Sequence, residues 1–244
     1  MAFRDIQSLP RQELLDFVNE NVGNLLEDEA LAVLDNPYAT PAICQRIAQT
    51  QRLTAFYSVR LRLVAHKLTP QAHAVKFIHY LYWADLVRLG VDVKIHAPVR
   101  RAIDTILVNR VGELTLGERI TSAKRCSQAL IKAFLFDPDP KVFEALLVNQ
   151  RLREDDLVFV AGSHRATTEQ LQLLAADRKW SFRYPIRKAL VMNPKTPRAT
   201  AASLLRSLTA RDLRMIHDHP GTSVYLRRCI ERLRPADYNL ALDA

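Results

Sequence analysis

The densest group of side chains that could carry acid–base or metal chemistry is His217-Asp218-His219, directly before Pro220. Two histidines separated by one residue do not share a helix face, so they make a poor pair of metal ligands. The sequence has no G-x-S-x-G, no glycine-rich phosphate loop, no H-E-x-x-H and no C-x-x-C. These are the short patterns that place nucleophiles, phosphates or zinc. We therefore predict a protein that is not an enzyme and that holds no cofactor and no metal.

The cysteines give no support to a cross-linked or metal-bound fold. Cys44, Cys126 and Cys229 lie far apart, and an odd number without close spacing argues against a disulfide framework or a zinc or iron–sulfur site. The first residues, MAFRDIQSLPRQELLDF, lack the apolar core of a secretion signal. No apolar stretch is long enough to cross a bilayer. These features predict a cytoplasmic protein.

Charge is unevenly distributed along the 244 residues. The net charge is +9, but residues 1–29 contain two arginines and seven acids, which leaves +14 for the rest of the chain. A basic body favours anionic partners such as nucleic acid, acidic peptides or anionic lipid, without choosing among them. The content of 48% hydrophobic and 25% charged residues is that of a folded soluble protein.

A five-residue signature recurs along the chain, which indicates that a repeated structural unit contains it. It reads VRLRL, VRRAI, VFEAL, IRKAL and LRRCI, with first residues Val59, Val99, Val142, Ile186 and Leu226. Successive copies start about 40–44 residues apart, a period that is typical of stacked helical repeats. The segments Val59–Val99 and Ile186–Leu226 align over their whole length without a gap and share ten identical positions. The repeat is therefore matched in register and not only in its signature.

The residues around the signature favour helices. Thr-Pro pairs at Thr40, Thr69 and Thr196 predict helix starts, because threonine caps free N–H groups and proline fits the first turn. Asp-Leu pairs mark a second short helix, and the signature forms a third. We expect the third helix to end at Asn109, Asn149 or Asn193, since asparagine tolerates the left-handed conformation common at helix ends.

These features resemble known helical repeat families. Three helices per unit resemble armadillo repeats, a turn followed by Val-Arg resembles HEAT repeats, and Asn193-Pro194-x-Thr196-Pro197 is similar to the leucine-rich repeat variant. The resemblance implies an all-α, right-handed α-solenoid of about five repeats over residues 30–234. We expect a single domain, 1–244, with residues 1–29 as an acidic capping helix and 235–244 as a tail. The iron–sulfur cluster of one leucine-rich repeat variant protein is not expected, because the clustered cysteines are absent.

By resemblance to armadillo proteins, the third helix would line a concave binding surface. The candidate binding residues on it are Arg60, Arg62, Arg100, Arg101, Arg187, Lys188, Arg227 and Arg228. Resemblance to HEAT repeats implies an alternative, in which the first arginine of each signature pairs with an aspartate of a neighbouring turn. The second basic position, at Arg101, Lys188 and Arg228, is expected to point toward solvent or a ligand.

Two further residue types admit two interpretations each. Trp180 stands in a basic turn and is a candidate either for an exposed partner anchor or for the core, whereas Trp83 is expected in the core. The three asparagines are expected to cap helices. The armadillo resemblance gives the alternative that they hold the backbone of a bound peptide.

The predicted function is non-catalytic binding of an acidic protein segment on a basic concave surface. Sequence-independent binding of DNA or RNA is the first alternative, and a glycosylase-like protein that acts on alkylated bases is a variant of it. A structural subunit of a larger assembly is the other. The oligomeric state stays open.

Overall fold

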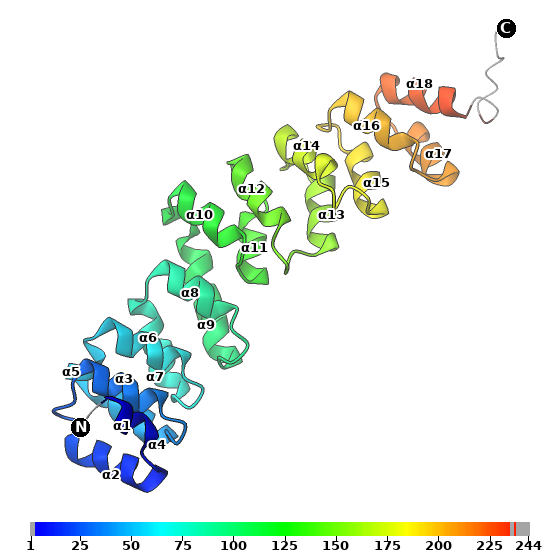
Figure 1. Ribbon diagram of the computed structural model, residues 1–244. Helices are drawn as coiled ribbons and strands as arrows, with labels where there is room; N and C mark the ends of the chain where they lie inside the picture. The colour runs from blue at the N-terminus through cyan, green and yellow to red at the C-terminus, as the bar shows by residue number, and fades with distance from the viewer. Residues whose placement is uncertain (1–2, 235–236, 238–244) are drawn as a thin grey trace. The chain divides into compact units, whose positions relative to one another are not determined.

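The computed structural model consists of helices and connecting turns over the residues that it describes, 3–234 and 237 (Figure 1). No strand occurs among these residues, which confirms the predicted all-α class. No helix within them combines the length and apolar character that crossing a bilayer requires. The predicted tail, 235–244, lies outside the described residues except for Asp237.

The chain divides into two compact units, and each is described by itself. Unit 1 comprises residues 1–118 and 125–130, and unit 2 comprises residues 119–124 and 131–244. The helices within unit 1 are α1 (Phe3–Ser8), α2 (Arg11–Asn21), α3 (Glu27–Asp35), α4 (Pro41–Gln49), α5 (Gln51–Thr54), α6 (Tyr57–Ala65), α7 (Gln71–Phe77), η1 (Ile78–Tyr80), α8 (Trp83–Gly90), α9 (Ala97–Arg110) and η2 (Val111–Glu113). Those within unit 2 are α12 (Pro140–Leu147), α13 (Glu154–Gly162), α14 (Thr168–Ala176), α15 (Tyr184–Met192), α16 (Arg198–Leu205), α17 (Ala210–Asp218) and α18 (Val224–Leu233). Helices α10 (Leu116–Ala123) and α11 (Gln128–Phe134) contain residues of both units.

The acidic segment 1–29 does not form the single capping helix that we expected. It forms α1, α2 and the first turn of α3. Pro10 separates α1 from α2, because its nitrogen carries no hydrogen for the bond that would continue a helix. The carboxylate of Glu29 accepts the N–H of Leu26 at 2.9 Å and so completes the start of α3.

The helices of unit 2 repeat those of unit 1 at a constant distance along the sequence. This distance, the offset, is the number of residues from Glu27, the start of α3, to Glu154, the start of α13. At this offset, helices α3, α4 and α6 begin and end at the positions that correspond to the bounds of α13, α14 and α15. Helices α7, α8 and α9 likewise begin at the positions that correspond to the starts of α16, α17 and α18. The same pairs pack in both units: α3 with α6 as α13 with α15, and α7 with α9 as α16 with α18. The gapless sequence match therefore belongs to a longer duplicated series of helices.

Helix starts follow the capping chemistry in part. Thr40 and Thr167 accept the N–H of the residue three positions on, at 3.4 and 3.2 Å, as expected of an N-cap. Thr69 and Thr196 do not cap a helix, which corrects the prediction for these Thr-Pro pairs. Their prolines adopt an extended conformation and are themselves the last residues before the helix, so each threonine lies one position too early and is buried.

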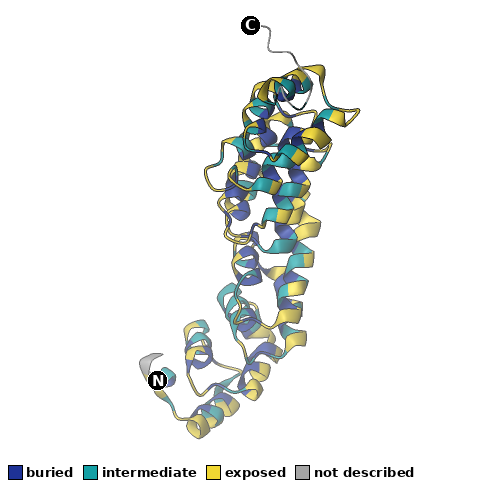
Figure 2. Cartoon of the chain, turned by 90° about the vertical axis from the view of Figure 1, so that its right-hand side faces the viewer, coloured by how far each residue is buried: buried dark blue, intermediate teal, exposed yellow. Residues whose placement is uncertain are grey.

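Each signature turns its first and fifth residues into the core. All five first residues are buried, and so are the fifth residues Leu63, Ile103, Leu146, Leu190 and Ile230. This i, i+4 pattern is that of a helix with one apolar face. Figure 2 shows the buried residues on the helix faces that meet other helices, with exposed residues on the outer faces. Each fully buried Val, Leu or Ile contributes about 1.5–3 kcal/mol of transfer free energy.

Buried amides close the helix ends. The Nδ2 of Asn193 donates to the carbonyls of Ala161 and Ser163 at 2.7 and 3.1 Å, and its Oδ1 accepts the N–H of Lys195 at 3.0 Å. Asn149 donates in the same way to the carbonyl of Ala123 at 2.7 Å. The last carbonyls of a helix lack partners within it, so these amides satisfy groups that burial would otherwise leave unpaired.

The asparagine prediction was right in role and wrong in detail. Asn149 and Asn193 are buried at helix ends, but Asn109 is an exposed residue inside α9. Asn193 is extended, with φ −80° and ψ 120°, rather than left-handed. Asn36, which was not predicted, binds a helix end in the same way, because its Nδ2 donates to the carbonyl of Ile6 at 2.8 Å.

Candidate anion-binding surface

The first arginine of four signatures binds the turn that precedes its own helix. Arg187 Nε donates to the carbonyl of Ser181 at 2.7 Å, and Arg100 Nε donates to that of Ile95 at 3.2 Å. Arg60 and Arg227 bind carbonyls in the corresponding turns. The acceptors are backbone carbonyls, so the expected pairing with an aspartate of a neighbouring turn is wrong. The structural interpretation of these arginines is nevertheless the one that the contacts favour.

The other predicted basic positions divide into paired and exposed side chains. Arg62 forms an ion pair with Asp35, and Lys188 Nζ lies 2.9 Å from an oxygen of Asp212. Arg101 and Arg228 are exposed, and neither has a side-chain bond to a residue that the structure describes.

Trp180 is part of the core. Only 4% of it is exposed, and its indole Nε1 donates to the carbonyl of Leu147 at 3.1 Å. The candidate role as an exposed anchor is therefore wrong, since the turn folds the indole onto the end of α12. Trp83 is buried as predicted.

Positive charge is concentrated at the C-terminal end of unit 2. Residues 195–234 contain nine Lys and Arg against three Asp and Glu, a net +6 of the total +9. All three acids already have partners. Asp212 accepts hydrogen bonds from Tyr184 and Lys188, which lower the pKa of its carboxyl. His217 lies 3.0 Å from both Asp218 and Glu231.

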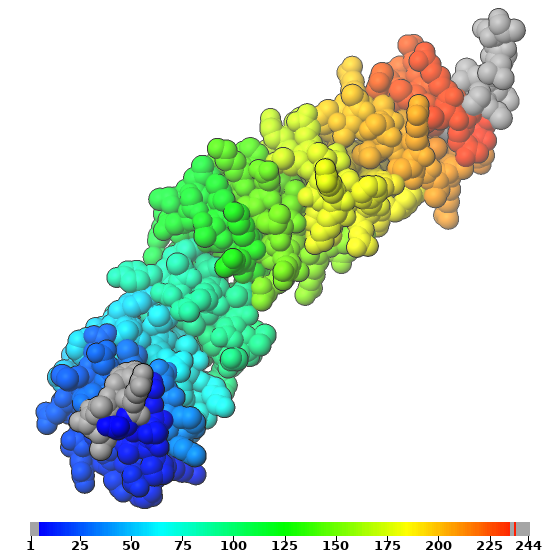
Figure 3. Space-filling model, in the orientation of Figure 1, coloured from blue at the N-terminus to red at the C-terminus, as the bar shows by residue number. Residues whose placement is uncertain are grey.

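Several arginines of α16, α17 and α18 are exposed and have no side-chain bond to a described residue. We call them the C-terminal arginine surface: Arg198, Arg206, Arg211, Arg228 and Arg232. The three helices that carry them form a continuous part of the molecular surface, orange to red in Figure 3. Because the neighbouring acids are engaged, these guanidinium groups are available to an external anion.

A groove of about 520 Å³ lies between α16 and α18 within this surface. Arg206 and Arg232 line it, together with Ala202, Leu233 and the partly buried Cys229. The lining of the groove thus combines two cationic side chains with apolar ones. Carboxylates bind guanidinium groups through two parallel hydrogen bonds, which gives such a groove a preferred type of ligand.

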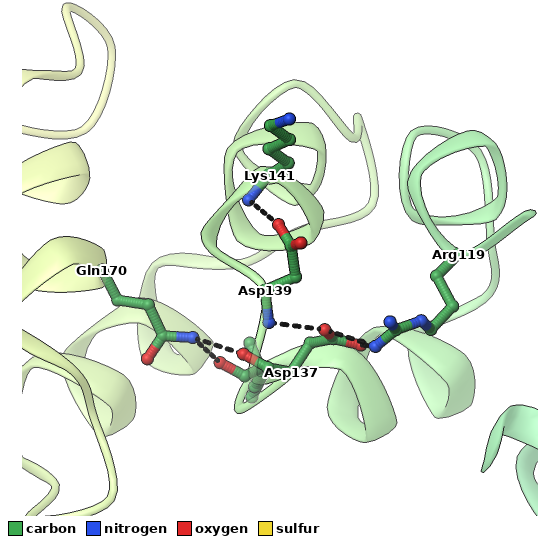
Figure 4. A network of polar contacts seen from close by, with 6 residues as sticks. Arg119, Asp137, Asp139, Lys141 and Gln170 are labelled. Atoms are coloured by element: carbon green, nitrogen blue, oxygen red, sulfur yellow. Dashed lines mark hydrogen bonds and ion pairs between the residues drawn. The ribbon is translucent and has the colours of Figure 1, made fainter. Parts of the chain in front are cut away.

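A buried ion pair shows the contrasting use of arginine in unit 2 (Figure 4). Arg119 Nη1 donates to both oxygens of Asp137, at 2.6 and 2.7 Å, and Asp137 also accepts the N–H of Asp139. The amide of Gln170 donates to the backbone carbonyl of Asp137 at 3.3 Å. Only 4% of the Asp137 side chain is exposed, so this pair fixes a turn and offers nothing to a ligand.

The sequence-based set overlaps the arginine surface only at Arg228. Arg198, Arg206 and Arg211 were missed because they lie on or directly after the first and second helices of the triplet, and Arg232 because it follows the signature on α18. Their local charge excess was a usable signal, since nine basic residues stand against three acids over the range 195–234.

In comparisons with protein-family models, with characterised proteins and with solved structures, no match to this chain was found. The likeness to armadillo, HEAT and leucine-rich repeat variant proteins therefore stands on the pattern of residues and helices alone.

Proposed function

We propose that the chain is a non-catalytic binding protein built as a right-handed α-solenoid of about five three-helix repeats. The order of helix starts supports this architecture. First helices would be α3, α7, α10, α13 and α16, each followed by a second helix and by a third that carries the signature. Helices α3, α4, α6, α7, α8 and α9 begin at the positions that correspond to the starts of α13 to α18, as expected of a repeated unit that buries its apolar face against the next.

The partner that we propose is an acidic segment of another protein, held by the C-terminal arginine surface. The observation that carries this proposal is the set of exposed arginines without a carboxylate partner among the described residues. Apolar side chains lie on the same helices: Val224 is 63%, Tyr225 44% and Met215 42% exposed. A protein ligand can cover such groups, whereas the phosphate backbone of a duplex cannot, so the mixture favours a polypeptide over a duplex nucleic acid.

A titration with defined peptides tests the proposal. A fluorescent peptide rich in Asp and Glu should bind the full chain, and a Lys-rich peptide of equal length should not. Replacing Arg206, Arg228 and Arg232 by Glu should weaken binding at least about a hundredfold, since each lost charge-assisted bond is worth about 1.5–3 kcal/mol. In the matched control, three exposed cations of unit 1, Arg11, Lys67 and Lys94, are replaced by Glu. This control should leave the affinity for the acidic peptide nearly unchanged.

The same assay separates the alternatives. Duplex DNA that binds more tightly than the acidic peptide, with a steep loss of affinity between about 50 and 300 mM salt, would identify a phosphate-binding surface instead. Equal losses in the variant and its control would mean that net charge, and not this surface, drives binding.

A further inference from the structure

A cluster of tyrosines in unit 1 carries two exposed aromatic rings. Tyr80 is 57% and Tyr82 69% exposed. The ring of Tyr82 lies 4.5 Å from that of Tyr57, centroid to centroid, and Cζ of Arg60 lies 5.0 Å from the ring centroid of Tyr80. Tyr57 and Arg60 are three positions apart on α6, and residues at that spacing are neighbours on a helix surface. The two exposed rings therefore rest on adjacent positions of one helical turn.

Hydrogen bonds fix the support beneath these rings. The hydroxyl of Tyr57 donates to the carboxylate of Asp85 and accepts the N–H of Tyr82, the latter at 3.1 Å. Arg60 is bound to the carbonyls of Thr54 and Ala55. Each exposed ring thus packs against an ordered group, while more than half of each tyrosine remains exposed to solvent.

The duplication in unit 2 shows which of these residues the fold needs. At the offset that relates α6 to α15, the support recurs as Tyr184, Arg187 and Asp212. Tyr184 donates to Asp212 and accepts the N–H of Thr209 at 3.1 Å, and Arg187 binds Ser181, the counterpart of Thr54. The hydrogen-bonded support is therefore common to both units.

The two tyrosines are not common to both units, although Arg187 also carries an exposed ring: its Cζ lies 5.5 Å from the ring centroid of Phe182, which is 71% exposed. Tyr80 and Tyr82 correspond to Ser207 and Thr209. Two cations of the same stretch of unit 1, residues 76–88, are also replaced, since Lys76 corresponds to Ser203 and Arg88 to Met215. The support folds without these two tyrosines and without these cations, so stability does not account for exposing two tyrosines to water in unit 1.

We propose that Tyr80 and Tyr82, with Arg60, Lys76 and Arg88 around them, form a platform that stacks the bases of single-stranded nucleic acid. The charge decides the class of ligand. Three cations accompany the rings, and the nearby acid Asp85 is already bound by Tyr57 and by Arg88, the latter at 3.0 Å. Open aromatic faces beside cations are the combination that binds single strands, because bases stack on rings while phosphates meet the positive groups. This platform is separate from the C-terminal arginine surface and does not depend on it.

The test uses the residues that the second unit supplies. The full chain is titrated with a fluorescein-labelled 12-nucleotide oligouridine and with a duplex of the same length at about 50 mM salt, where phosphate contacts are strong. The single strand should bind more tightly. Replacing Tyr80 by Ser and Tyr82 by Thr together should weaken single-strand binding about ten- to hundredfold, in line with the loss of two stacked bases. Folding should survive, because Ser207 and Thr209 occupy these positions in unit 2 and Thr209 caps its helix.

Two control variants and one competing ligand make the outcome decisive. Phe182 is an exposed aromatic residue of unit 2 whose counterpart is Ala55, so Phe182→Ala should leave oligouridine binding unchanged. The variant with Arg206, Arg228 and Arg232 replaced by Glu should keep the preference for single strands even where it abolishes binding of the acidic peptide. Equal affinity for single strand and duplex, or an effect below about twofold for the tyrosine variant, would overturn the proposal. So would tyrosine-dependent binding of an oligoproline peptide in place of oligouridine.

Discussion

Removing the side-chain amide of Asn193 should cost unit 2 a large part of its stability. Asn193 is 5% exposed, donates two hydrogen bonds to the carbonyls of Ala161 and Ser163, and accepts a third from the N–H of Lys195. A net contribution of about 0.5–1.5 kcal/mol for each of the three bonds gives a loss of about 1.5–4.5 kcal/mol for Asn193→Ala. The two carbonyls that lose their donor make the upper part of that range the expected one.

Urea unfolding measures this loss. Tryptophan fluorescence in a Trp83→Phe background reports unit 2 through the buried Trp180. The control is Asn109→Ala, a residue that the sequence alone placed in the same role but that is exposed inside α9. Because α9 belongs to unit 1, its unfolding is followed through the buried Trp83 in a Trp180→Phe background. Asn109→Ala should change the free energy of unfolding by less than about 0.5 kcal/mol, because alanine is the better helix former. A loss below about 0.5 kcal/mol for Asn193→Ala would refute the assignment of these hydrogen bonds.

Three further outcomes are expected. Glu231 raises the pKa of His217, so the stabilising effect of this contact is present below the ordinary histidine pKa and is lost as pH rises through the raised one; urea unfolding of His217→Gln should differ from the parent more at about pH 5.5 than at pH 8.5. Arg187→Met loses the bond to Ser181 and should lower stability by about 1 kcal/mol in the same assay, while acidic-peptide affinity stays within about twofold. Burial raises the pKa of Cys44 to about 11, so iodoacetamide should not label it in the native protein at about pH 8, and mass spectrometry of labelled peptides checks this.

The periodicity of the sequence correctly predicted which residues of the signature helices are buried. The signature residues Val99 and Ile103 are buried because a helix turns positions four apart to one side. The acceptor of Arg187 could not be predicted in this way, since the carbonyl of Ser181 becomes reachable only when the intervening turn is folded. The candidate role of Trp180 as an exposed anchor was wrong for the same reason. A position in a turn does not show which helix end the indole packs against.

The C-terminal arginine surface could not be predicted from the sequence, because its residues come from three different helices. Arg206 and Arg232 belong to the segments of α16 and α18, and only helix packing brings them to one groove. Their availability depends in addition on the partners of Asp212 and Glu231, which are set by contacts between helices. A charge count can point to the segment but cannot tell engaged groups from available ones.

Side chains from later turns bind the last carbonyls of earlier helices, and this arrangement affects local unfolding. The carbonyl of Ala123 is bound by Asn149, that of Leu147 by Trp180, and that of Ala161 by Asn193. Each helix end in this series is completed by a side chain from a turn that comes later in the sequence. Local opening of a later turn therefore exposes the end of an earlier helix and lowers the free energy needed to open that helix. Amide hydrogen exchange within unit 2 should accordingly spread from turn to turn toward lower residue numbers, so that neighbouring helices exchange as linked groups.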